Sequence, residues 1–192
     1  MRVIAGAYRG RSLRAVAGAE VRPTSDRLRE TLFNILSPSI RGSRFLDLCA
    51  GSGAVGIEAL SRGASHVTFI ESSRRARSSI EANLRTLGIA DGARLITRDA
   101  LTALKHLAEM SEQFDLVFFD PPYASELYDN VLSKLAESNL IGPDSIVIVE
   151  HRAKHRLAAS FSHLKLYRQV KQGESAFSFY KLEDDLETAP DF

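Results

Sequence analysis

The sequence is poor in cysteine, with Cys49 as the single thiol in 192 residues. One cysteine excludes an internal disulfide framework and any zinc site built from several cysteines, and it suits a reducing compartment. The first residues lack the apolar centre of a signal peptide, and no run approaches the roughly 18 apolar residues of a membrane span. We therefore expect a cytoplasmic protein that does not enter a membrane.

A large excess of charge of one sign is also absent from the whole chain, whose formal net charge is +1. The balance is uneven along the sequence, because residues 1–44 hold nine arginines, no lysine and three acids, whereas residues 45–192 hold sixteen basic and twenty-one acidic residues. The two parts therefore carry +6 and −5. Arginine suits bidentate phosphate contact and base stacking, so this region indicates either a nucleic-acid partner or an ordinary solvated face.

Apolar runs alternate with amphipathic segments through most of the chain, which predicts a parallel sheet covered on both faces. Residues 2–6 and 11–16 predict an N-terminal hairpin, and a helix follows from about Asp26 to Pro38. Residues 164–171 and 176–182 predict an antiparallel C-terminal hairpin. The other predicted strands are 45–49, 66–70, 94–97, 114–119 and 145–150, and the other predicted helices are 54–62, 74–87, 101–110 and 125–138.

These elements together predict one doubly wound, Rossmann-like α/β fold with a mostly parallel sheet. We divide the chain into a basic hairpin-and-helix extension at residues 1–40, the α/β domain at 41–183 and an acidic tail at 184–192.

A glycine-rich motif, Gly51-Ser52-Gly53-Ala54-Val55-Gly56, follows the first predicted strand of the parallel sheet and opens a helix. Glu71 lies twenty residues after Gly51, at the end of the next strand. In open α/β sheets such glycines let the backbone approach a nucleotide, and the acid accepts hydrogen bonds from its ribose hydroxyls. The motif therefore predicts a nucleotide site.

The acid Asp47, four residues before Gly51, distinguishes between possible nucleotides. A carboxylate here opposes a pyrophosphate but favours S-adenosylmethionine, which carries an ammonium and a sulfonium group. The pattern D-x-x-x-G-x-G-x-x-G resembles the first motif of Rossmann-like methyltransferases. Asp99-Ala100 follows the third strand where that family places an acid near the adenine amino group, and Asp99 is equally suited to cap the next helix.

The segment Asp120-Pro121-Pro122-Tyr123 ends the fourth strand of the parallel sheet and should border the same crevice. Its prolines leave carbonyls that only accept hydrogen bonds, Asp120 adds a carboxylate and Tyr123 offers a flat face to a base. These groups suit the exocyclic amine of a nucleobase. The segment resembles the [D/N]-P-P-[Y/F] motif of amino-methyltransferases acting on adenine N6, cytosine N4, guanine N2 or glutamine N5.

The N-terminal block narrows the resemblance. Arg22-Pro23-Thr24-Ser25-Asp26-Arg27, continuing into Arg29-Glu30-Thr31-Leu32-Phe33-Asn34, is similar to the opening of the RsmD-type family of bacterial small-subunit rRNA guanine-N2 methyltransferases. The similarity continues through residues 46–53, 120–123 and 177–180. It implies a metal-free methyl transfer from S-adenosylmethionine to the N2 amine of one guanine in 16S rRNA, the guanine numbered 966 in that RNA.

The resemblance also implies partners and site residues. It implies 16S rRNA, in an assembled or partly assembled small ribosomal subunit, as the partner of a monomeric enzyme. We expect catalysis at Asp120, Pro121, Pro122 and Tyr123. We expect cofactor binding at Thr24, Asp47, Ala50, Gly51, Ser52, Gly53, Glu71, Ser72, Asp99, Ala100 and Asp120. RNA contacts are expected at Arg2, Arg9, Arg11, Arg14, Arg22 and Arg27.

Three alternatives share parts of this pattern: a DNA adenine-N6 methyltransferase, a protein glutamine methyltransferase and an NAD-dependent oxidoreductase. The first class usually carries a target-recognition segment for which this chain has no room, and the second favours asparagine at position 120. Asp47 argues against NAD. The remaining residues suggest no other site: Cys49 is expected in the core, and His151, like the other four histidines, is expected at the surface or in a cap, without metal-ligand spacing.

Overall fold

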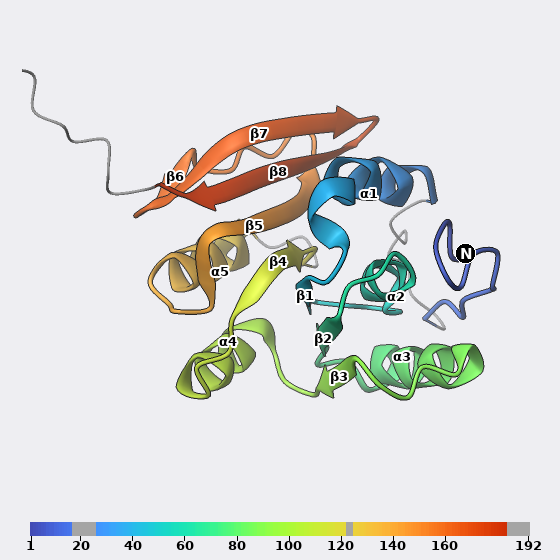
Figure 1. The fold of residues 1–192 in the computed structure, drawn as a ribbon. Coiled ribbons are helices and arrows are strands. Elements are labelled where there is room, and N and C mark those ends of the chain that lie inside the picture. The colour runs from blue at the N-terminus through green and yellow to red at the C-terminus, as the bar shows by residue number, and fades with distance from the viewer. Residues whose placement is uncertain (17–25, 122–124, 184–192) are drawn as a thin grey trace, which may run out of the picture.

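The apolar runs pair into one sheet of eight strands in the computed structural model, which describes residues 1–16, 26–121 and 125–183 (Figure 1). The strand order is β3-β2-β1-β4-β5-β8-β7-β6, with β1 to β5 parallel and the last three strands antiparallel. The parallel strands are β1 (Arg44–Leu48), β2 (His66–Ile70), β3 (Ala93–Ile96), β4 (Phe114–Phe119) and β5 (Ile141–Arg152). The antiparallel strands are β6 (Ser160–Phe161), β7 (Leu164–Gln172) and β8 (Ser175–Leu182).

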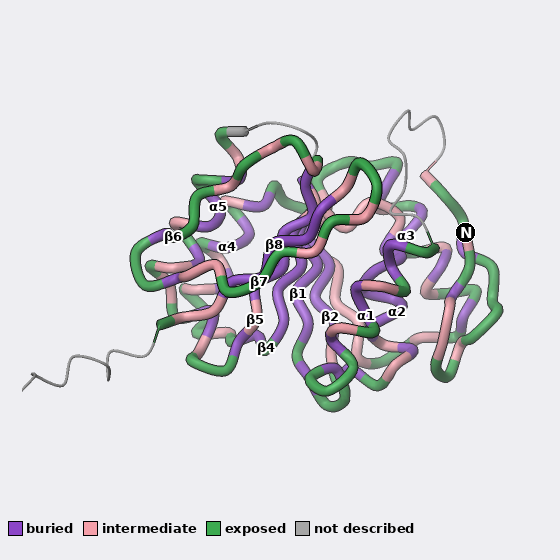
Figure 2. The backbone as a smooth tube through the Cα atoms, turned by 90° about the horizontal axis from the view of Figure 1, so that it is seen from above, coloured by how far each residue is buried: buried purple, intermediate pink, exposed green. Residues whose placement is uncertain are grey.

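Helices cover both faces of this sheet, as the doubly wound prediction required (Figure 1). One face carries α1 (Asp26–Ile40), α2 (Ala54–Ser61) and α3 (Arg74–Leu87), and the other carries α4 (Ala100–Glu109) and α5 (Ser125–Ala136). Side chains alternate along a strand, so Phe118 packs toward the first face and Phe119 toward the second. Figure 2 shows that the buried backbone is concentrated in the central strands. Within the described residues, none of the helices combines the length and apolar character needed to cross a membrane.

Several predicted boundaries are wrong by a few residues. β1 ends at Leu48, and Cys49 has a left-handed φ of 63°, so this cysteine lies in a turn and not within the strand. Helix α1 continues past Pro38 to the buried Ile40, because the fixed φ of proline is that of a helix and only the N–H of Pro38 itself is lost. β6 was not predicted, because a two-residue strand shows no periodicity.

The predicted N-terminal hairpin is only partly correct. The two segments do pair antiparallel at Arg2 and Ser12, and the Val3 N–H donates to the Arg11 carbonyl at 2.9 Å. They form no regular strands, because the N–H groups of Ile4 and Ala5 donate instead to the carboxylate of Glu58 in α2. The N-terminal segment is therefore held by α2 in addition to its own pairing.

This segment also shares the hydrophobic core of the α/β domain. Val3 and Leu13 are buried in the same cluster as Phe33 of α1 and Ile57 of α2. Further along, the side chain of Asn83 in α3 both accepts from the Arg14 N–H at 2.7 Å and donates to the Arg14 carbonyl at 3.0 Å. Residues 1–16 thus lie across α2 and α3.

Candidate active site at the switch point of the sheet

The strand order reverses between β1 and β4, and ligands of open α/β sheets bind at such a reversal, beyond the carboxyl ends of the strands. Leu48 of β1 is in register with Phe119 of β4. The N–H of the next residue, Asp120, donates to the Leu48 carbonyl at 3.5 Å. The glycine-rich turn and the start of the Asp-Pro-Pro-Tyr segment therefore lie at one edge of the sheet.

Two positions of the turn require glycine, each for a different physical reason. Gly53 immediately precedes α2 with a left-handed φ of 77°, which favours glycine. Gly56 lies against Phe69 of β2, and a Cβ at this position would come within 2.3 Å of the Phe69 ring. The last glycine of the motif thus permits close packing of α2 on β2.

Asp47 is buried inside the turn, with 1% of its surface exposed, and its carboxylate accepts the N–H of Gly56 at 2.9 Å. Burial raises the pKa of Asp47 to about 7; the Gly56 hydrogen bond opposes the shift, and the nearby Glu71 carboxylate adds to it. In this structure Asp47 supports the turn from within. Its contact with a ligand stays a prediction.

Glu71, at the end of β2, joins two turns. Its carboxylate accepts the N–H of Gly51 at 2.8 Å and the N–H of Ser73 at 2.7 Å. The side chain is only half-buried, and each carboxylate oxygen can accept a second hydrogen bond. Glu71 therefore retains acceptor capacity toward a ribose while it positions the glycine-rich turn.

Asp99 caps α4, as one of its two predicted roles required. Its carboxylate accepts the N–H of Thr102 at 2.9 Å, and this hydrogen bond holds the pKa of the exposed Asp99 below its usual value. Contact with an adenine stays a prediction. Two other expected cofactor residues form hydrogen bonds: the Ala50 N–H donates to the Ile70 carbonyl at the end of β2, and the Ser52 carbonyl accepts from the Asn83 side chain. Ser72 is exposed and Ala100 is buried. Thr24, Pro122 and Tyr123 lie outside the described residues.

The environment of Asp120 is acidic and poorly solvated. Burial raises the pKa of its carboxyl well above the usual value, and the carboxylates of Glu150 and Asp47 raise it further. Pro121, which follows, is buried. A carboxylate with a raised pKa is a better proton acceptor near neutral pH than an ordinary aspartate.

Cys49 shows that the predicted acids are gathered around one point. Burial raises the pKa of its thiol to about 12, with additional contributions from the carboxylates of Glu71, Asp120, Asp47 and Asp99, in that order. A thiol in this environment stays protonated at neutral pH and is a poor nucleophile. An edge with four carboxylates disfavours a pyrophosphate and fits a cationic ligand such as S-adenosylmethionine.

Two residues near this edge were missed or misassigned. Glu150, 8% exposed at the C-terminal part of β5, was missed, although an acid that closes the apolar run Ser145–Val149 follows the pattern used for Asp120. The prediction that His151 lies at the surface or in a cap is wrong, because it is 2% exposed and its Nε2 lies 2.9 Å from the Ser178 hydroxyl. β5 continues to Arg152 and pairs with β8, which covers His151.

Most of the expected RNA-binding arginines that can be described are unobstructed. Arg2, Arg9, Arg14 and Arg27 are exposed, and Arg11 is exposed while its guanidinium donates to the Thr86 carbonyl at 3.2 Å. Arg22 lies outside the described residues. Arg29, from the same arginine-rich block, is by contrast fully buried and bonds to Asp26 and to the Arg2 carbonyl.

The fold and the acidic switch-point site define a Rossmann-like methyltransferase. A solved structure from Escherichia coli, provisionally named methyltransferase yhhF, superimposes with a TM-score of 0.83 at 35% identity and covers 95% of this chain and 98% of its own. A Thermus thermophilus hypothetical protein superimposes with a TM-score of 0.80 at 29% identity, over 95% of this chain and 99% of its own.

The chain belongs to the family described as conserved hypothetical protein 95, the RsmD family, whose family model matches residues 1–181. The ribosomal RNA small subunit methyltransferase D of Haemophilus influenzae is 42% identical over 78% of this chain and 78% of its own length. The protein of the same name from Escherichia coli K12 is 35% identical over 100% of this chain and 94% of its own length. The resemblance seen in the N-terminal block is thereby confirmed.

Proposed function

We propose that this protein transfers a methyl group from S-adenosylmethionine to the exocyclic N2 amine of one guanine in small-subunit rRNA. The observation that carries the proposal is the position of Asp120, whose N–H bonds to the end of the strand leading into the glycine-rich turn. An acceptor for an amine therefore lies beside a turn suited to a nucleoside. The names of the two relatives support small-subunit rRNA as the substrate.

Different carboxylates would bind different parts of S-adenosylmethionine, which supplies the electrophilic methyl group. Glu71 would accept hydrogen bonds from the ribose hydroxyls, and Asp99 would lie near the adenine amino group. Asp47, Thr24 and the turn residues 50–53, with Ser72 and Ala100, would form the rest of the pocket. The clustering of acids around Cys49 supports this assignment, because the ligand carries positive charge.

Asp120 and the carbonyls of the Asp-Pro-Pro-Tyr segment would accept the N–H groups of the guanine amine, while Tyr123 stacks on the base. The amine nitrogen forms its bond to the methyl carbon as the carbon–sulfur bond breaks, and the bonding electron pair stays on sulfur. The amine proton then passes to Asp120 or to water, and the raised pKa of Asp120 favours the former. Alignment of the reacting atoms is worth up to roughly 7–11 kcal/mol in favourable cases.

Six of the nine arginines in the first 44 residues would hold the RNA through its phosphates. Arg2, Arg9, Arg11, Arg14, Arg22 and Arg27 are assigned this role because the region carries +6 while the rest of the chain carries −5. We assign the substrate to 16S rRNA in an assembled or partly assembled small subunit, methylated in the cytoplasm by a monomer without a metal ion.

The proposal is tested by incubating the protein with isotopically labelled S-adenosylmethionine and small subunits from a strain that lacks the gene. Nucleoside mass spectrometry of the digested RNA should detect labelled N2-methylguanosine with the wild type and almost none with Asp120→Ala. Labelled N6-methyladenine in a parallel DNA sample, or label in protein glutamine, would replace the proposed substrate. Tighter binding of NAD than of S-adenosylhomocysteine would reject the methyltransferase assignment.

A further inference from the structure

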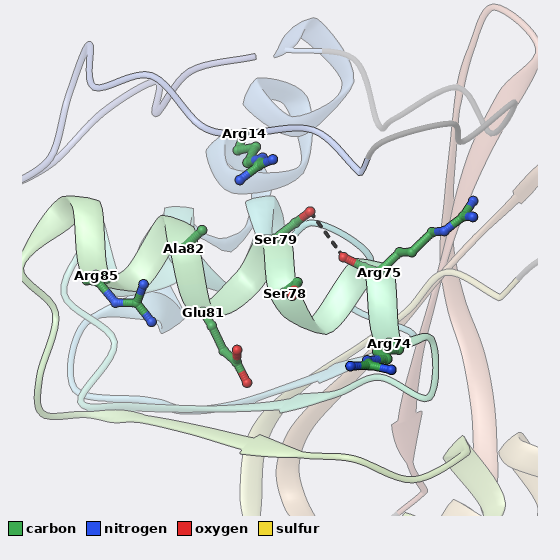
Figure 3. Close-up of a pocket in the computed structure, with 8 residues that line it drawn as sticks. All are labelled: Arg14, Arg74, Arg75, Ser78, Ser79, Glu81, Ala82 and Arg85. Atoms are coloured by element: carbon green, nitrogen blue, oxygen red, sulfur yellow. Dashed lines mark hydrogen bonds between the residues drawn. The ribbon is translucent and has the colours of Figure 1, made fainter.

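Helix α3 carries a second group of arginines that the RNA assignment above does not use. Arg74, Arg75 and Arg85 are exposed along it, and Arg14 of the N-terminal segment approaches the same helix (Figure 3). Together they line a groove of about 450 Å³. We propose that this groove binds the phosphate backbone of the substrate RNA next to the target nucleotide; this inference rests on the function proposed above.

The shape of the groove allows a backbone to approach. Between the arginines its lining consists of small side chains, Ser78, Ser79 and Ala82, with Glu81 as the single acid of the lining. Figure 3 shows Arg85 toward one end of the helix and Arg74 and Arg75 at the other, with Arg14 over the middle. The rise from Arg74 to Arg85 is about 16 Å at about 1.5 Å per residue, so the arginines can contact more than one phosphate of a strand.

The arginines of the groove form no ion pair with an acid among the described residues. In the part of the chain that the structure describes, no ion pair involves Arg14, Arg74, Arg75 or Arg85. Arginines elsewhere differ, since Arg62 pairs with Glu58 at 2.7 Å and is not fully exposed. The groove side chains are thus free to form bidentate contacts with phosphate oxygens.

The placement of these cations is unfavourable for the helix itself. The N-terminus of a helix carries partial positive charge and prefers acids, yet the first turn of α3 contains Arg74, Arg75 and Arg77 and no acid. The helix dipole and the guanidinium groups together attract an anion. Glu71 directly follows β2 and lies three residues before α3, so this positive end lies next to the edge where the target nucleotide must enter.

The test replaces Arg74, Arg75 and Arg85 together with glutamine and leaves Arg14 and the rest of the N-terminal segment unchanged. Binding is measured against salt concentration for a small-subunit rRNA transcript and for poly(U), because phosphate contacts do not depend on sequence. We expect affinity to fall about tenfold or more for both RNAs, and the slope of log affinity against log salt to decrease by about 2. Affinity for S-adenosylhomocysteine should stay unchanged, and the triple Arg→Lys variant should retain most of the slope.

The matched control replaces Lys105, Lys134 and Lys171, all exposed on other parts of the surface, with glutamine. It removes the same charge and should change RNA affinity by less than about twofold. Equal behaviour of the two variants would overturn the proposal. A loss confined to intact small subunits, with both RNAs bound normally, would also overturn it and indicate an acidic protein partner instead. If the wild type fails to methylate small-subunit rRNA, the proposed function fails, while the poly(U) measurement still decides whether the groove binds phosphates.

Discussion

Arg29 of α1 and Glu58 of α2 form an ion pair in which neither side chain has exposed surface, with Nε and Oε2 3.8 Å apart. The Glu58 carboxylate also accepts the N–H groups of Ile4 at 2.8 Å and Ala5 at 3.0 Å. One buried acid therefore holds both α1 and the N-terminal segment against the helix that follows the glycine-rich turn.

Glu58→Gln should lower the free energy of unfolding by about 3 kcal/mol, because the buried guanidinium of Arg29 then keeps only the partly exposed Asp26 as a counter-charge. Denaturant titration measures the change. Glu81→Gln, at an exposed position of α3, is the matched control and should stay within about 0.5 kcal/mol of the wild type. Equal stability of the two variants would show that the buried pair contributes nothing.

The titration of Asp47 should make the folded state less stable as pH rises. Its folded pKa of about 7 exceeds the ordinary 3.8, so the folded state binds this proton more tightly than the unfolded state. The resulting stability is present in full below about pH 4 and is lost as pH rises through 7. Asp47→Asn has no titrating group at this position and does not lose this stability. Between about pH 4 and pH 7, its free energy of unfolding should therefore rise relative to that of the wild type by up to about 4 kcal/mol.

Urea titrations at several pH values check this expectation, with Asp144→Asn, at an exposed position of β5, as the control. A difference between Asp47→Asn and the wild type that does not change with pH would contradict it.

Glu71→Ala should weaken binding of S-adenosylhomocysteine by roughly 1–3 kcal/mol, because the ribose hydroxyls and the N–H groups of Gly51 and Ser73 lose their acceptor. Calorimetric titration measures the affinity. Glu81→Gln again serves as the control. Unchanged affinity in Glu71→Ala would mean that this carboxylate only orders the backbone.

Asp120→Ala should reduce turnover by about two orders of magnitude or more and change S-adenosylhomocysteine affinity only a few-fold, since the carboxylate acts on the amine and its developing charge. Single-turnover kinetics and calorimetry separate the two effects. Asp129→Asn, which removes an exposed acid of α5, should leave both unchanged. Collapse of affinity with preserved turnover would instead assign Asp120 to cofactor binding.

Replacing Arg9, Arg11 and Arg22 together with glutamine should weaken RNA binding. The slope of log affinity against log salt should decrease by about 0.7–0.9 for each phosphate that the protein no longer neutralises. S-adenosylhomocysteine binding should persist. The control is the triple variant of Lys105, Lys134 and Lys171. If the Arg9, Arg11 and Arg22 variant keeps the wild-type salt slope, or loses the cofactor as readily as the RNA, these arginines are structural.

Much of the site could be predicted because its determinants are local. Burial on both faces makes residues 116–119 of β4 a continuous apolar run. The chain order then places Asp120 at the carboxyl end of β4, the edge that the parallel topology shares with Gly51. The sequence suited Asp99 equally to capping α4 and to contacting a ligand, because both roles require the same residue at the same place. Only the tertiary structure shows that Asp99 caps the helix.

The sequence by itself determined the doubly wound fold, the glycine-rich turn and the acidic strand ends, because periodicity, glycine conformation and strand order act over short stretches of chain. Only the tertiary structure decided which charges are buried. Arg29 resembles its exposed neighbour Arg27 in sequence, and His151 resembles a surface histidine, yet both are buried by segments distant along the chain. Likewise, Arg14 lies against α3 because the Asn83 side chain binds its backbone. The charge of the groove depends on such long-range contacts, and no local sequence pattern encodes them.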